Sequence, residues 1–249
     1  MLLSLQGQVK PIEFTHMGKR IGFIDALIIA LVYLLCLCIP SIASISGGNR
    51  DWIIFLIQVL FATSLFAFLG YRGAAHKRSL LALPLFLICL TNPLALAFQK
   101  KSGFDYELLV GGIFLSLSAA IAEETIFRGV LLDSLEGKAD WEKILISSLA
   151  FALAHLISSS FSLGSLIQFG YSFAFGLFAS YVYLKGFGLL GAISLHFLFN
   201  LINGYLFSSL GGQNSGLAFY AVNLVVGALL IAYLIMLILL DMRKEKSRR

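Results

Sequence analysis

Charged residues are scarce in this sequence. Only 12% of its 249 residues are Asp, Glu, Lys or Arg, and 59% are hydrophobic. Soluble domains carry about twice that share of charge. The composition and a mean hydropathy of +0.92 therefore exclude an ordinary soluble globular domain and predict a polytopic membrane protein.

Cysteine is also rare. The three cysteines, Cys36, Cys38 and Cys89, all lie in apolar runs, where cysteine commonly serves as a small buried hydrophobe. They form neither a disulfide framework nor a zinc-binding pattern. Charged residues such as Lys10 and Glu13 precede the first apolar run, so a cleavable signal peptide is not expected.

Long apolar runs fill most of the chain. By the criterion of about 20 mainly apolar residues, we predict spans at about 22–45, 52–70, 80–98, 107–132, 143–160, 165–184, 187–208 and 217–240. We therefore expect an all-α polytopic membrane protein with about eight transmembrane helices. Short connections leave no room for a separate soluble domain, so residues 1–249 are interpreted as a single integral membrane domain.

Basic residues are distributed unevenly between alternate loops. One set of loops, together with both termini, holds 14 of the 18 lysines and arginines, and the other set holds only Arg50, Lys100 and Lys101. The positive-inside rule then places both termini in the cytoplasm and favours a bacterial or archaeal cell membrane. The basic tail, residues 243–249, is interpreted as a topology determinant that also contacts anionic lipids, and no nucleic-acid partner is expected.

The fourth predicted span contains three ionisable side chains, Glu123, Glu124 and Arg128. A charge at the bilayer centre costs roughly 2.5–3.5 kcal/mol on insertion scales, so such residues suggest a functional site. Residues four apart lie on one face of a helix. We therefore expect Arg128 to pair with Glu124 and to leave Glu123 as the unpaired carboxylate, a candidate general base. The alternative is a cytoplasmic helix end.

Two other spans carry polar side chains at a similar depth. Measured from the predicted cytoplasmic ends, Glu123, His155 and His196 lie roughly 14–18 Å deep at 1.5 Å per residue. His196 and Asn200, four residues apart, could present two donors to one point, as an oxyanion hole requires. Each could also be a tie between helices, but three helices with polar groups at one depth favour an active site, with Phe151 packing against His155.

Together these residues resemble the motifs of a known family. Glu123-Glu124-x-x-x-Arg128, Phe151-x-x-x-His155 and His196-x-x-x-Asn200 occur in this order on separate apolar segments. They resemble the three motifs of the CAAX protease and bacteriocin-processing family, also called the Abi family, over about residues 107–204. The turn Lys185-Gly186-Phe187-Gly188 departs from the Thr-Gly-Ser type turn of many members, which puts substrate specificity in doubt.

The resemblance implies a glutamic-type intramembrane endopeptidase with eight helices around an intramembrane active-site cavity. In this family the first glutamate and the second-motif histidine activate a water, and the third-motif histidine and asparagine hold the oxyanion. By position these are Glu123 with His155, and His196 with Asn200. Glu124, Arg128 and Phe151 would support them, and no cofactor would be needed.

Two other functions use the same residues. Two histidines and a glutamate can hold a catalytic zinc, although the usual His-Glu-x-x-His helix is absent. A non-catalytic transporter or immunity protein could use the polar cluster for binding or proton movement. For a peptidase, the expected partners are membrane lipids and a peptide or protein substrate, either lipid-modified or membrane-anchored.

Overall fold

The protein is described by a computed structural model that covers residues 21–68, 80–99, 103–157, 162–212 and 217–246. Much of the basic charge that predicts the orientation, including Lys100, Lys101 and the last three residues of the tail, lies outside these described residues. The N-terminal segment that contains Lys10 and Glu13 also lies outside them.

Every regular element in the described ranges is helical, as the composition predicts. The polypeptide forms α1 (Phe23–Ile42), α2 (Gly48–Phe68), η1 (Leu80–Leu90), α3 (Thr91–Leu96), α4 (Tyr106–Glu124), η2 (Thr125–Leu132), α5 (Asp140–Ile157), α6 (Leu163–Tyr181), η3 (Val182–Phe187), α7 (Gly188–Leu198), η4 (Phe199–Leu206), α8 (Phe207–Ser209) and α9 (Leu217–Lys246). Several of these elements follow one another without a break.

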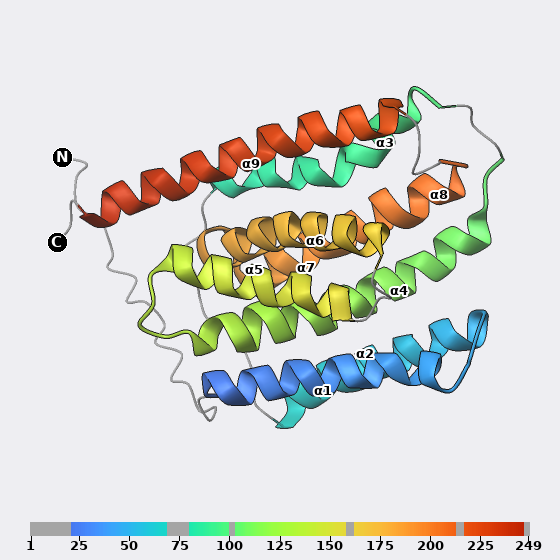
Figure 1. The fold of residues 1–249 in the computed structure, drawn as a ribbon, viewed down its shortest axis with the longest axis horizontal. Coiled ribbons are helices and arrows are strands. Elements are labelled where there is room, and N and C mark those ends of the chain that lie inside the picture. Colours follow the sequence, from blue (N-terminus) through green and yellow to red (C-terminus); the bar gives the residue numbers. More distant parts are fainter. Residues whose placement is uncertain (1–20, 69–79, 100–102, 158–161, 213–216, 247–249) are drawn as a thin grey trace, which may run out of the picture.

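The helices lie roughly parallel in three layers (Figure 1). The hairpin of α1 and α2 forms one outer layer, and α9 with η1 and α3 forms the other. The middle layer contains α4, α5, α6 and α7, and α5 and α6 pack closely along their lengths. The motif-bearing segments therefore lie between two layers of apolar helices.

Within the described ranges, five helical segments are long and apolar enough to cross a membrane: Phe23–Pro40, Gly48–Ala67, Tyr106–Leu132, Leu163–Ser209 and Phe219–Lys244. The first, second and last are at most 22% buried, whereas the other two are 44% buried. Apolar helices that remain this exposed are suited to contact lipid. The middle layer therefore holds the more buried of these segments.

The 47-residue segment Leu163–Ser209 folds back on itself at Gly188. This glycine has φ +67° and ψ −154°, a conformation that is open almost only to glycine. Phe175 on one side of the turn packs against Phe199 on the other, with ring centroids 4.8 Å apart. The segment therefore corresponds to two of the predicted spans.

Polar ties connect the layers. Ser118 on α4 donates a hydrogen bond of 2.6 Å to Gln58 on α2. The Asn203 side chain in η4 accepts from the backbone N–H of Asn92 at 3.0 Å and donates to the carbonyl of Ile88 at 2.8 Å. Such hydrogen bonds hold apolar helices together where little hydrophobic driving force exists between them.

Candidate active site

Glu124 and Arg128 form the predicted ion pair at the centre of the middle layer. Arg128 Nη1 lies 3.0 Å from Glu124 Oε1, and both side chains are 0% exposed. The guanidinium also donates to the carbonyl of Gly176 on α6 at 3.4 Å and stacks 4.5 Å above the Phe151 ring. Buried charges need this kind of pairing and hydrogen bonding to be tolerated.

Gly176 allows α6 to approach this pair. A Cβ at Gly176 would lie 3.0 Å from Ser148 Cα on α5, which is tighter than ordinary van der Waals contact. Without a side chain at this position, the two helices pack closely enough for the Gly176 carbonyl to reach Arg128. The ion pair is thus fixed by three segments, α4 with η2, α5 and α6.

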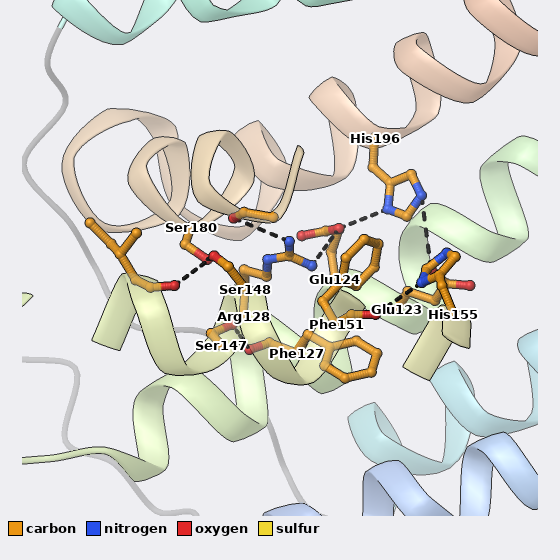
Figure 2. Close-up of polar contacts among 12 residues, drawn as sticks. Glu123, Glu124, Phe127, Arg128, Ser147, Ser148, Phe151, His155, Ser180 and His196 are labelled. Atoms are coloured by element: carbon orange, nitrogen blue, oxygen red, sulfur yellow. Dashed lines mark hydrogen bonds and ion pairs between the residues drawn. The ribbon is translucent and has the colours of Figure 1, made fainter. Parts of the chain in front are cut away.

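His196 on α7 is anchored to the same ion pair. Its Nδ1 atom lies 2.7 Å from Glu124 Oε1, and its side chain is 4% exposed. Since Glu124 Oε1 accepts from Arg128 as well, the hydrogen of this contact belongs to the imidazole, so His196 Nδ1 is the donor. The Nε2 atom then points away from Glu124 and toward Glu123, as Figure 2 shows.

Glu123 faces His196 but does not bond to it directly. Glu123 Oε2 and His196 Nε2 are 3.9 Å apart, a separation that a water molecule can bridge. Oε2 is buried and has no hydrogen-bond partner among the described residues, although the side chain as a whole is 13% exposed. The other oxygen, Oε1, accepts a long hydrogen bond of 3.5 Å from the Tyr33 hydroxyl.

The hydrogen bond between Tyr33 and Glu123 is a contact that the sequence analysis did not predict. The four-residue spacing separates Glu123 from Arg128, as predicted. Spacing within one helix carries no information about partners on other helices, and Tyr33 is 90 positions away in the sequence. A buried tyrosine in an apolar helix is the signal that could have indicated this contact, because a buried hydroxyl usually has a hydrogen-bond partner.

Phe151 on α5 contacts both histidines. Its ring centroid lies 4.5 Å from that of His155 and 5.8 Å from that of His196. Its carbonyl oxygen lies 2.9 Å from His155 Nδ1, and because a carbonyl can only accept, Nδ1 donates. In the neutral ring the lone pair is then on Nε2. Phe151 thus packs against His155, as the sequence predicts, and also against Arg128 and His196 (Figure 2).

Asn200 occupies a different local structure from the one assumed. The chain changes from α-helix to π-helix at Phe199, and i→i+5 hydrogen bonding widens the helical turn. The i, i+4 argument that placed His196 and Asn200 at one point assumes an uninterrupted α-helix. The partly buried Asn200 side chain has no hydrogen bond within the ranges that the structure describes.

π-Helical turns occur beside the two glutamates, Arg128 and His196. The η2 segment begins immediately after Glu124 and contains Arg128, and η4 begins three residues after His196. Such turns are rare in proteins and frequently mark functional sites. Among the described residues, no three His, Cys, Asp or Glu side chains are grouped so that they could hold a metal ion.

The fold and the site define a class of protein: its described residues are helical, with five candidate membrane spans, and they enclose a cluster of two glutamates, two histidines and one arginine, of which Glu124, Arg128 and His196 are buried. Residues 105–202 match a family model, Rce1-like, described as type II CAAX prenyl endopeptidase Rce1-like. These residues form a domain of that family, which confirms the resemblance of the three motifs and implies a membrane protease. No curated protein and no solved structure matches the chain.

Proposed function

We propose that this protein is a glutamic-type intramembrane endopeptidase. The observation that carries the proposal is the buried Glu123 Oε2, which lacks a hydrogen-bond partner in the described structure and lies 3.9 Å from His196 Nε2. A carboxylate oxygen and an imidazole nitrogen at this separation can hold one water between them. The family of residues 105–202 supports peptide-bond hydrolysis as the reaction of that water.

In the proposed reaction Glu123, with His155, removes a proton from the water as its oxygen bonds to the scissile carbonyl carbon. The resulting oxyanion is stabilised by His196 and Asn200. Collapse of this intermediate breaks the C–N bond, and the proton held by Glu123 passes to the leaving amine. General-base catalysis typically contributes 10²- to 10⁴-fold, and one oxyanion donor about 10²- to 10³-fold.

Glu124 and Arg128 support this reaction without touching the substrate. Because Glu124 Oε1 accepts from His196 Nδ1 at 2.7 Å, the ring is oriented with Nε2 toward the reaction centre. A proton on Nε2 would then be directed at the developing oxyanion. Arg128 balances the Glu124 charge, and Phe151 fixes the planes of both histidines.

The proposed setting is a single integral membrane domain over residues 1–249, with the motif-bearing core at about 107–204. We propose eight transmembrane helices around an intramembrane cavity, both termini in the cytoplasm and a bacterial or archaeal cell membrane as the location. The substrate is a peptide or protein, lipid-modified or anchored in the membrane. Prenylated CAAX proteins, bacteriocin precursors and C-terminal sorting tails all fit this description chemically.

The test is a comparison of Glu123→Gln with Glu107→Gln, which alters an exposed carboxylate on the same helix. Peptides from membranes that contain each variant are compared by mass spectrometry with peptides from wild-type membranes. We expect one precursor to accumulate with Glu123→Gln and none with Glu107→Gln, with cleavage reduced about 10²- to 10⁴-fold. Normal processing by Glu123→Gln would contradict the mechanism.

Chelation of divalent metals in the same assay separates this mechanism from the zinc alternative. We expect the wild-type protein to keep its cleavage rate after treatment with a chelator, because the water is activated by Glu123 and His155. A rate that falls on chelation and returns with added zinc would instead favour a metallopeptidase.

A further inference from the structure

Tyr33 on α1 reaches the proposed catalytic base from outside the matched family domain. The tyrosine is 1% exposed, and its hydroxyl donates to Glu123 Oε1 at 3.5 Å. Its ring packs edge-on against Phe61 of α2, with centroids 5.2 Å apart and the planes inclined by 65°. The hydroxyl is thus held in place by an aromatic contact between two helices that precede residue 105.

Two further buried polar side chains lie behind this hydroxyl. Ser118 on α4 donates to Gln58 Oε1 at 2.6 Å. Because this contact uses the amide oxygen, the Gln58 nitrogen remains as donor, and the Gln58 side chain interacts with that of Tyr33. Ser118, Gln58 and Tyr33 are exposed by only 6%, 5% and 1%, respectively.

Two of the contacts are directional hydrogen bonds. Ser118 donates to Gln58, and Tyr33 donates to the Glu123 carboxylate. The Tyr33 hydroxyl fixes Oε1, so that rotation of the carboxylate does not exchange it with Oε2.

We propose that Tyr33, with Gln58 and Ser118 behind it, is a positioning residue for Glu123. It holds the carboxylate turned so that Oε2 faces His196. The consequence for catalysis rests on the function proposed above, but the effect on the carboxylate does not. The proposal gives α1 and α2, which lie outside residues 105–202, a role in the chemistry of the site.

The titratable and charged groups around Glu123 define what the test must hold constant. They are Tyr33 on α1, His155 on α5, His196 on α7, and Glu124 and Arg128 in its own continuous segment.

Tyr33→Phe removes one hydroxyl and keeps the ring. Tyr233→Phe is the matched control, because the Tyr233 hydroxyl also ties two segments by donating to the Leu81 carbonyl at 2.8 Å, but on the α9 side of the molecule.

The first measurement is independent of activity. Dicyclohexylcarbodiimide modifies protonated carboxyl groups in apolar surroundings, and mass spectrometry of the purified full chain in detergent gives the labelling rate at Glu123. We expect Tyr33→Phe to raise that rate about tenfold, because the carboxyl group loses the hydrogen bond that holds Oε1 in place. Gln58→Leu should raise it less, and Tyr233→Phe should leave it unchanged. Labelling of Tyr33→Phe at the wild-type rate would overturn the proposal.

The second measurement uses the precursor that accumulates with Glu123→Gln. We expect Tyr33→Phe to lower kcat about tenfold and to leave KM within about twofold. A merely structural tie would lower the amount of folded enzyme and leave kcat per folded molecule unchanged, which would contradict a positioning role. If the wild-type protein cleaves no precursor, the peptidase proposal fails, whereas the labelling rates still decide whether Tyr33 controls the Glu123 carboxylate.

Discussion

At the scale of single residues, adjacent glutamates have separate environments. Glu124 is fully buried and its Oε1 atom bonds to Arg128 and His196, whereas Glu123 is partly exposed and its Oε2 atom faces His196 Nε2 at 3.9 Å. One oxygen of each carboxylate has no hydrogen-bond partner in the described structure. Neighbours on a helix point about 100° apart, which accounts for the division. The proposed chemistry needs both environments, because one carboxylate fixes the imidazole and the other takes a proton.

The Arg128–Glu124 pair gives a prediction about stability. Arg128→Met leaves Glu124 buried without its counter-charge, and removal of one partner of a buried pair costs about 3–5 kcal/mol. Glu124→Gln combined with Arg128→Met removes both charges and should recover much of that loss. Unfolding of the purified proteins in detergent measures both changes in free energy.

The control for this prediction is the Lys185–Asp140 pair, whose side chains are 26% and 33% exposed. Lys185→Met should cost no more than about 1 kcal/mol, as exposed pairs do. The explanation would be wrong if Arg128→Met and Lys185→Met had equal effects, or if the double variant were less stable than Arg128→Met alone.

At the scale of elements, α4 carries Glu123 and packs against η4, which carries Asn200. Gly112 permits this packing, because a Cβ there would lie 2.2 Å from Tyr205 Cγ and 2.4 Å from Tyr205 Cβ. These are atoms at the base of the tyrosine side chain, so a change of rotamer cannot relieve the clash. Any larger residue at position 112 must separate the two elements.

We therefore predict that Gly112→Ala destabilises the protein by about 1–3 kcal/mol, the usual range for overpacking, and lowers cleavage. Gly111→Ala is the neighbouring control, since nothing lies within 4 Å of the Cβ it would add. Alanine also favours a helix over glycine, so Gly111→Ala should be neutral or stabilising. Equal losses in the two variants would mean that backbone flexibility, not contact with Tyr205, sets the effect.

The elements also show which features a sequence can predict. The predicted span at 22–45 corresponds to α1 at Phe23–Ile42, and that at 217–240 corresponds to most of α9, because apolar length alone determines such segments. The Glu124–Arg128 pair follows from helical spacing. The π-helical turns depend on tertiary packing, and the Tyr33–Glu123 contact depends on how α1 docks on α4. Neither is encoded in a local pattern.

At the scale of the whole molecule, the segments that carry most of the described lysines and arginines lie at one end. Tyr181 on α6 donates to Asp241 on α9 at 3.1 Å, and one small surface depression is lined by Asp140, Lys185 and Asp241. The start of α5, the end of η3 and the end of α9 therefore lie together. In Figure 1 the turn between α1 and α2, near Arg50, lies at the opposite end. The basic residues near the start of α5, the end of η3 and the end of α9 are those that predict a cytoplasmic end.

This arrangement gives a prediction about orientation. Reporters that are active on only one side of the membrane can be inserted at Gly137, between η2 and α5, or at Gly47, between α1 and α2. We expect the Gly137 site and the C-terminus to report the cytoplasm and the Gly47 site to report the outside, because lysine and arginine are retained on the cytoplasmic face. Four continuous helical segments separate Gly137 from the C-terminus: α5, α6 with η3, α7 with η4 and α8, and α9. If each crosses the membrane once, the even number of crossings returns the chain to the same side. If the reporters at Gly137 and at the C-terminus indicate opposite sides, the eight-helix topology is wrong. One of these four segments, with α5 as the first candidate, would then remain within one leaflet.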